Sequence, residues 1–397
     1  MNLFSDEVRR NPYPLYAQMR ATSPVLRVPP PFNGWVVFDY ESVKWVLNDH
    51  ETFSSRVPAP RNWFIFFDPP AHTKLRALIS RAFTPRMIAN LEPRIRELSG
   101  ELLDRAMVGD TMDLAADYAV PLPMKVIAGM IGIPLSDWAT YKRWSDCILR
   151  LSYSRSGGEE AEQSVREFHA ASSEMRDYLA GLIAAQQRQP LDDLLTRLIE
   201  AEVDGERLSA EEVLGFFQLL VVAGQETTSD LIDNAILSLL EHPDQLARLR
   251  AEPALLESAI EEVLRYRSPL QWVMRTPRRD VQVRGQTIPA GSLLLPMIGS
   301  ANRDAGAFAE PDRFEIARQP NPHVAFGHGL HFCLGAALSR LEARIALTDV
   351  LTRFRRMELA SEEPWPPRQA LHVHGPASLP IRFQASSRAA AGSSALD

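Results

Sequence analysis

Cysteine is scarce in this sequence, whose 397 residues include only Cys147 and Cys333. Two isolated thiols cannot form a disulfide framework, so each cysteine needs its own explanation. A structural zinc site or an iron–sulfur cluster needs several clustered ligands, and neither cysteine has a second one nearby. These two classes of metal site are therefore excluded.

Long apolar runs are also missing. No stretch of about 18 residues is continuously apolar, and the most apolar segment, 213–224, is interrupted by Gln218. Residues 1–7 are polar and contain no apolar core of a signal peptide. We therefore expect no membrane anchor and a cytoplasmic location.

Positive charge is not in excess, and no linker divides the chain. The formal net charge is −7 and the sequence pI is about 5.8, which argues against a nucleic-acid partner. No low-complexity linker or fixed-period repeat is present. We expect one domain over residues 1–383, followed by an Ala- and Ser-rich tail, 384–397, that is disordered.

Apolar residues recur at helical spacing over most of the chain, and β-like segments are few and short. The pattern predicts a mainly α fold with small peripheral β-sheets. One predicted helix of roughly 30 residues, on the order of 45 Å long, should span the core. The predicted helices are 91–107, 165–185, 210–241, 255–266 and 336–354, and the predicted strands are 34–40, 281–283 and 287–289.

The most informative segment reads Phe326-Gly-His-Gly-Leu-His-Phe-Cys333-Leu-Gly335, directly before a predicted helix. Its glycines allow the backbone to bend closely around a ligand, and the helix N-terminus favours a thiolate on Cys333. A single axial thiolate on haem requires only one cysteine. Cys147 lacks such a setting, and we interpret it as a structural thiol.

This segment resembles the haem-binding loop of the cytochrome P450 family, Phe-Gly-x-Gly-x-His-x-Cys-x-Gly, at every fixed position. The resemblance extends over nearly the whole chain and implies a single domain that encloses haem b. It makes Cys333 the axial ligand of the iron. It also places four further loop residues beside the cofactor: Phe326, Gly327, His331 and Gly335.

Glu262-Val-Leu-Arg265 places opposite charges three residues apart on a helix, which by itself indicates only a weak surface ion pair. It resembles the family's Glu-x-x-Arg pair, a buried structural brace of the cysteine loop. The resemblance implies a third partner, either Arg313 or Arg318, and the sequence does not choose between them.

His72 and Arg76 lie four residues apart at the start of a predicted helix, where one anion could contact both side chains. Alone, each residue would be read as a solvated surface group. In the family, the matching residues reach a haem propionate. The resemblance adds Arg275 and His331 as further propionate contacts.

The run Ala223-Gly-Gln-Glu-Thr-Thr228 interrupts the long apolar helix with glycine, an acid and hydroxyls. Glycine and an unpaired carboxylate are both unfavourable there, although a packing notch with a solvent-facing Glu would explain them too. The run resembles the family's oxygen-binding groove. That resemblance places Ala223 and Gly224 beside the haem and makes Glu226 and Thr227 the catalytic acid–alcohol pair.

The family's substrate-recognition segments predict the walls of a substrate pocket. We expect Gln271 and His372 to offer hydrogen bonds, and the polar segment 150–170 to form a lid. Departures from the family pattern are small and bear on substrate fit and haem environment: Gln225, Val273 and His374. The predicted pocket residues are Leu219, Val222, Ala223, Leu270, Gln271, Trp272, His372 and Val373.

The resemblance implies a monooxygenase that inserts one oxygen atom from O2 into a small-to-medium apolar molecule, by hydroxylation or epoxidation. No flavin or iron–sulfur motif is present, so a separate electron donor such as a ferredoxin with its reductase is expected. Three rival functions are a peroxide-driven oxygenase, in which the acid–alcohol pair should be replaced, a haem-thiolate sensor, and a helical protein without a cofactor. Candidate docking cations are Lys74, Arg81, Arg340 and Arg344.

Overall fold

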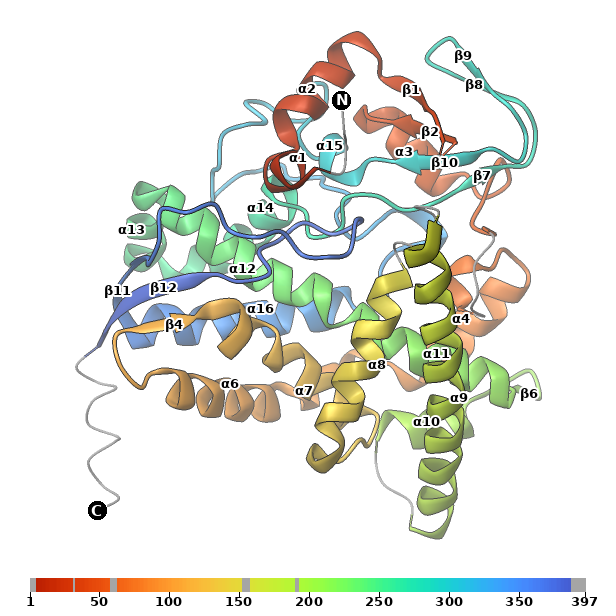
Figure 1. Ribbon diagram of the computed structural model, residues 1–397, viewed down its shortest axis with the longest axis horizontal. Coiled ribbons are helices and arrows are strands. Elements are labelled where there is room, and N and C mark those ends of the chain that lie inside the picture. Colours follow the sequence, from red (N-terminus) through yellow and green to blue (C-terminus); the bar gives the residue numbers. More distant parts are fainter. Residues whose placement is uncertain (1–4, 31–32, 58–62, 152–157, 190–192, 387–397) are drawn as a thin grey trace.

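A computed structural model describes residues 5–30, 33–57, 63–151, 158–189 and 193–386. Helices dominate it, as the sequence predicts (Figure 1). The helices are α1 (Asp6–Arg10), α2 (Tyr13–Thr22), α3 (Tyr40–Asn48), α4 (Ala71–Ala82), α5 (Pro85–Asn90), α6 (Glu92–Ala106), α7 (Pro121–Met130), α8 (Trp138–Arg150), α9 (Gly158–Arg188), α10 (Leu194–Glu200), α11 (Ala210–Ala223), α12 (Glu226–Glu241), α13 (Pro243–Ala251), α14 (Leu256–Tyr266), α15 (Ile298–Ala301) and α16 (Ala336–Arg353).

The strands form small separate sheets. In one, β2 pairs antiparallel with β1 and parallel with β10; in another, β12 lies between β11 and β4. The strands are β1 (Val25–Val28), β2 (Gly34–Val37), β3 (Phe53–Ser54), β4 (Thr111–Asp113), β5 (Glu202–Val203), β6 (Glu206–Arg207), β7 (Thr276–Pro277), β8 (Val281–Val283), β9 (Gln286–Ile288), β10 (Leu293–Pro296), β11 (Phe354–Leu359) and β12 (Pro380–Ala385).

Several predicted boundaries need correction; the predicted helix 165–185, for example, runs from Gly158 to Arg188. The predicted strand 34–40 ends at Val37, because Asp39 accepts a hydrogen bond from the Ser42 N–H and caps α3. The strand β12 extends to Ala385, two residues beyond the predicted end of the domain at 383. Residues 387–397 of the predicted tail lie outside the described residues.

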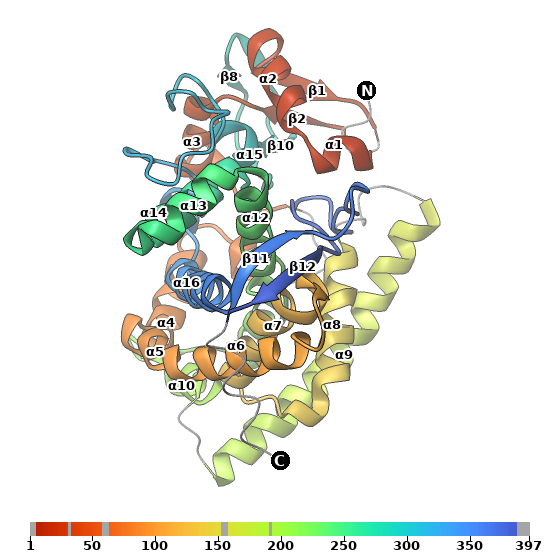
Figure 2. The same cartoon turned by 90° about the vertical axis from the view of Figure 1, so that its left-hand side faces the viewer.

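The predicted helix 210–241 is two helices, α11 and α12, separated at Gly224 and Gln225. A side chain on Gly224 would meet Ile127 at 2.9 Å, so a residue without Cβ allows α7 to approach closely. Helix α12 is buried along most of its length and packs against α14, α16 and the π-helical turn Leu114–Ala119 (Figure 2). It therefore forms the centre of the core.

No helix among the described residues is both long and apolar enough to cross a bilayer. The cytoplasmic location stays a prediction.

Candidate active site

A cavity of about 420 Å³ lies beside the junction of α11 and α12. Its size is that of a typical small-molecule site. Its walls are mostly aliphatic and aromatic, and they come from segments far apart in the chain: the end of α8, the junction of α11 and α12, the segment 269–275 and the loop before α16. Most of the predicted site residues border this one cavity.

Cys333 borders the cavity in the loop that precedes α16. Gly327 and Gly329 have φ values of 75° and 71°, a region that favours glycine, and the Cys333 N–H donates to the Phe326 carbonyl at 2.9 Å. Cys333 is exposed to the cavity, but the surrounding protein desolvates its thiol and raises its pKa, whereas hydrogen bonding from the Gly335 N–H lowers it. Binding of a metal ion would favour the thiolate decisively.

The predicted brace is a buried cluster. Glu262 and Arg265 form two hydrogen bonds, of 2.7 and 2.8 Å, and both side chains have 0% exposure. Arg318 completes the cluster, because its Nε lies 3.1 Å from both oxygens of Glu262. Arg313 contributes its backbone carbonyl to Arg265, while its own guanidinium pairs with exposed Glu310.

Arg265 also joins distant backbone segments. Its guanidinium donates to the carbonyls of Asn302 and Pro311 at 3.0 and 2.7 Å. Asn302 in turn accepts a hydrogen bond from the Val324 N–H at 2.8 Å, just before the cysteine loop. The brace thus acts through backbone contacts to fix the segment that leads to Cys333.

The four predicted propionate contacts lie close together. The rings of His72 and His331 are 4.1 Å apart, and Arg76, Arg275 and His331 border the cavity. Arg76 donates to the Phe332 carbonyl at 2.7 Å, and Arg275 to the Met274 carbonyl at 2.8 Å. These neutral acceptors leave both guanidinium charges uncompensated by hydrogen bonding.

Burial favours the neutral form of both histidines. It lowers the pKa of His72 to about 4, with Arg76 adding to the effect, and that of His331 to about 2, with Arg275 adding to it. Both ring nitrogens of His72 are buried without a hydrogen-bond partner in the described structure. A neutral imidazole has one N–H donor, and this unpaired donor beside two guanidinium groups suits an anionic ligand, such as the carboxylates of a haem.

Glu226 and Thr227 border the cavity where α12 begins. Burial and, to a smaller extent, the nearby Asp230 carboxylate raise the pKa of Glu226 to about 8. Oxygen Oε2 of Glu226 is buried without a hydrogen-bond partner in the described structure. The Thr227 hydroxyl donates to the Ala223 carbonyl at 2.9 Å, which leaves its oxygen able to accept a proton or a hydrogen bond.

The predicted pocket residues, with one exception, border the cavity. Those that do are Leu219, Val222, Ala223, Leu270, Trp272, His372 and Val373, as do Gly224, Phe326, Gly327 and Gly335 beside the predicted cofactor site. Of the three departures from the family pattern, Val273 borders it as well. Gln225 instead accepts a hydrogen bond from the Ser145 hydroxyl, and His374 lies against a smaller cavity.

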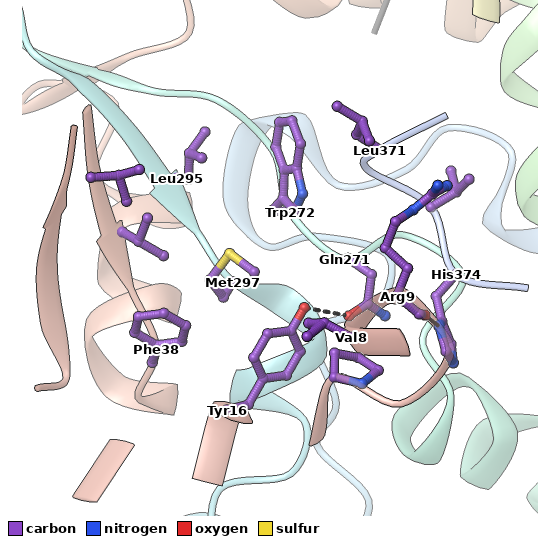
Figure 3. Close-up of a pocket in the computed structure, with 14 residues that line it drawn as sticks. Val8, Arg9, Tyr16, Phe38, Gln271, Trp272, Leu295, Met297, Leu371 and His374 are labelled. Carbon is purple, nitrogen blue, oxygen red and sulfur yellow. Dashed lines mark hydrogen bonds between the residues drawn. The ribbon is translucent and has the colours of Figure 1, made fainter. Parts of the chain in front are cut away.

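Gln271 is the exception, and its predicted place in the substrate pocket is wrong. Its amide oxygen accepts a hydrogen bond from the Tyr16 hydroxyl at 3.0 Å (Figure 3). Its amide nitrogen donates to the Ser268 carbonyl at 2.7 Å. It therefore borders a separate cavity of about 40 Å³. Alternation along extended backbone explains this, because Leu270 and Trp272 on either side face the large cavity.

Sequence reasoning missed an aromatic wall of the cavity. Trp63, Phe64 and Phe66 precede α4, and Phe216 faces them from α11. The Phe64 and Phe216 rings are 6.0 Å apart. No motif marks these residues, because aromatic residues in such positions look the same as ordinary core.

The predicted lid, 150–170, is only partly described. Residues 152–157 lie outside the described residues, and Gly158 begins the long helix α9. Leu151 borders the cavity. Cys147 is half-buried on α8 and packs against the hydrophobic core, away from the cavity lining.

The comparisons with known proteins agree with this geometry. A family model described as cytochrome P450 matches residues 160–379. The chain is 42% identical over 359 residues to the putative cytochrome P450 YjiB of Bacillus subtilis (strain 168), covering 89% of this chain and 90% of that protein.

Solved structures are similar as well. Cytochrome P450 CYP109Q5 from Chondromyces apiculatus is 39% identical with a TM-score of 0.88, over 98% of this chain and 99% of that one. CYP109E1 from Bacillus megaterium, in complex with corticosterone, is 39% identical with a TM-score of 0.86, over 95% and 99%.

A lone cysteine at a helix N-terminus, beside an apolar cavity with a cationic rim, defines a haem-thiolate protein. Among haem-thiolate proteins, the similar proteins are cytochromes P450. The chain belongs to the cytochrome P450 family, and it is a monooxygenase whose cofactor is haem b, bound through a cysteine thiolate.

Proposed function

We propose that this enzyme inserts one oxygen atom from O2 into a small-to-medium apolar organic molecule, by hydroxylation or epoxidation, with electrons from a separate protein. One observation carries the proposal. An acid and an alcohol, Glu226 and Thr227, border the same apolar cavity as Cys333. A sensor or a simple binding protein has no need of such a proton-transfer pair.

Cys333 and four further residues would hold the haem. Cys333 would provide the thiolate ligand, and His72, Arg76, Arg275 and His331 would bind the propionates by charge and by hydrogen bonding. When bound, haem supplies the reduction and splitting of O2. The chain contributes binding, orientation, exclusion of water and the movement of protons.

Proton movement falls to Glu226 and Thr227. Burial favours protonated Glu226 at neutral pH, since its pKa is raised to about 8. The carboxylic acid can then donate a proton, and the Thr227 hydroxyl can accept and pass one beside the cavity. The apolar walls keep bulk water away from this route.

The substrate class follows from the cavity lining. Leu219, Val222, Leu270 and Val373 offer apolar contact, and His372 offers a polar group. CYP109E1, which is similar over nearly the whole chain, has been crystallised with corticosterone. A steroid of that size is therefore the first probe that we propose.

A ferredoxin and its reductase are the proposed electron donors. Of the four predicted docking cations, three already have carboxylate partners: Lys74 with Glu206, Arg340 with Glu261, and Arg344 with Glu92. Arg81 is exposed at the end of α4. The paired carboxylates offset the positive charges of Lys74, Arg340 and Arg344. We therefore expect docking to depend on Arg81 more than on these three residues.

The test is turnover under ¹⁸O2 with a ferredoxin, its reductase, NADPH and corticosterone. The proposal expects one ¹⁸O atom in the product and hydrogen peroxide as a minor product. Product formed only with added peroxide would favour the peroxide-driven alternative. A haem-thiolate spectrum without any oxygen consumption would favour a sensor and would overturn the proposal.

A further inference from the structure

Three carboxyl groups lie on one face of α12. Glu226, Asp230 and Asp233 are four and three residues apart, and each is at most 8% exposed. Each has one oxygen that is buried without a hydrogen-bond partner in the described structure: Oε2 of Glu226, Oδ2 of Asp230 and Oδ1 of Asp233. Buried carboxylates are costly unless they are paired, so this face needs an explanation.

One guanidinium bridges two of these groups. Arg368 donates to Asp230 at 2.8 Å and to Asp233 at 2.9 Å, and both carboxylates have 0% exposure. Burial alone would lower the pKa of Arg368, but Asp230 and Asp233 outweigh burial and raise it. We call Asp230, Asp233 and Arg368 the α12 triad.

Arg368 stands at the base of a backbone hairpin, 367–376, between β11 and β12. Pro367 pairs with Pro376, and the Arg368 N–H donates to the Gly375 carbonyl at 3.1 Å. The hairpin lies so close to α12 that a side chain on Gly375 would meet Asp230 at 2.3 Å. The triad therefore sits where the hairpin meets the helix.

The far end of the same hairpin borders the active-site cavity. His372 and Val373 are part of the cavity wall, and they are held against the segment 269–275 by backbone contacts. The Gln271 N–H donates to the His372 carbonyl at 2.8 Å, and Val373 forms a β-bridge with Leu270. A shift at the base would thus move the cavity wall.

Two members of the triad, Asp230 and Arg368, also affect the pKa of Glu226 through their charges. Asp230 raises the pKa of Glu226 and Arg368 lowers it, although burial remains the largest cause of its rise to about 8. Other elements contribute smaller effects: Asp146 on α8 raises this pKa, and Arg9 on α1 lowers it. Replacing Asp230 should therefore change how readily Glu226 gives up its proton.

We propose that Arg368 is a positioning residue that anchors the hairpin 367–376 to α12, so that one buried ion triad fixes both the substrate-facing wall and the charge around Glu226. This inference rests on the proposed function. It adds that the same ion cluster holds the cavity wall that faces the substrate and sets the charge around the residue that moves protons. The triad lies outside the residues that would contact haem.

The first test is Asp230→Asn in the haem-loaded enzyme, because Asn keeps the shape and can still accept from Arg368. The readout is peroxide released per NADPH consumed between pH 6 and 9. Removing a negative charge should lower the pKa of Glu226, so peroxide loss should begin about one pH unit lower than in the wild type. An unchanged pH profile would overturn the charge role of the triad.

The second test is Arg368→Lys, which keeps one charge but loses the two-armed guanidinium. The readout compares the affinities of 1-dodecylimidazole, whose alkyl tail is long enough to reach the cavity wall, and imidazole, which is too small to do so. We expect the affinity ratio to fall on the order of tenfold with imidazole binding unchanged. Arg382→Lys, in an exposed pair with Glu358, is the matched control and should leave the ratio unchanged.

An unchanged affinity ratio in Arg368→Lys would overturn the anchoring role. If this variant forms no holoprotein, the azole affinity ratio is measured in Asp230→Asn instead, because that substitution weakens the ion pair that holds Arg368, and an unchanged ratio there would overturn the anchoring role. Azole binding needs no turnover, so an inactive wild type would reject the proposed function while the anchoring role is still measured.

Discussion

Two buried ion clusters in this enzyme have opposite balances of charge. In the brace, one carboxylate, Glu262, meets the guanidinium groups of Arg265 and Arg318. In the α12 triad, two carboxylates, Asp230 and Asp233, share the single guanidinium of Arg368. The brace has donors in excess, whereas the triad and neighbouring Glu226 have carboxylate oxygens in excess.

The difference shows in the hydrogen bonds. Both oxygens of Glu262 accept hydrogen bonds, and the guanidinium of Arg265 has carbonyl acceptors in three further residues. In the triad, one oxygen of each aspartate is buried without a hydrogen-bond partner among the described residues. A saturated cluster holds one arrangement, while a cluster with spare acceptors can take up and release protons. The brace is therefore a structural cluster, whereas the α12 triad is suited to a functional role.

Breaking the brace should have the largest effect. Arg265→Ala leaves the Glu262 carboxylate buried with a reduced set of partners, and loss of one member of a buried pair costs about 3–5 kcal/mol. We expect a fall of that size in the free energy of urea unfolding, together with reduced haem content. Arg96→Ala, in an exposed pair with Glu92, is the control and should cost less than about 1 kcal/mol. Equal losses in the two variants would refute the structural role of the brace.

The second effect concerns stability and pH at Glu226. Between pH 4.5 and 8 the folded protein retains a proton that the unfolded chain has lost, so stability falls as the pH rises through this window. In Glu226→Gln the side chain cannot ionise, so this loss of stability with rising pH disappears. By pH 8 the free energy of unfolding of the variant should exceed that of the wild type by a few kcal/mol, as measured by urea unfolding across the pH range. Parallel stability curves would show that Glu226 is ionised in the folded protein.

Thr227→Ala should have a smaller, purely catalytic effect. The hydroxyl donates only to the Ala223 carbonyl of its own helical region, so its loss should leave the fold intact. A positioned proton-transfer group contributes roughly 10²–10⁴-fold to a rate, and its loss should divert electrons to hydrogen peroxide. We expect product per NADPH to fall about tenfold with substrate binding unchanged. Wild-type coupling in this variant would transfer the proton role to water or to the substrate.

The smallest effect is expected at the surface. Arg81→Glu should slow reduction by a ferredoxin several-fold and flatten its salt dependence, because complementary charge acts mainly on association rate. Arg356→Glu, on β11, is the control and should leave reduction unchanged. Identical salt series for the two variants would place docking on another face.

The sequence predicted those parts of the site in which residue type alone determines chemistry. A thiol before a helix, the pair of Glu262 and Arg265, and the run that interrupts the long helix all have recognisable patterns. Side-chain direction was harder to predict, as Gln271 shows, because it depends on how an extended segment sits between two cavities. The choice of Arg318 over Arg313 likewise depended on a loop conformation with no local signal.

The α12 triad was missed for a related reason. Asp230 and Asp233 are anomalous acids in an apolar helix, and that pattern could have raised the question of a partner. Arg368, however, lies far away in the chain, on a hairpin whose approach depends on Gly375. Only the folded chain brings these residues together.

We propose that Cys333 alone supplies the thiolate of this haem monooxygenase. The most direct measurement is the absorption spectrum of the ferrous protein under carbon monoxide, for the wild type, Cys333→Ser and Cys147→Ala. We expect a thiolate-type spectrum in the wild type and in Cys147→Ala, and its loss in Cys333→Ser. A thiolate-type spectrum that survives in Cys333→Ser and disappears in Cys147→Ala would show that Cys147, and not Cys333, is the ligand.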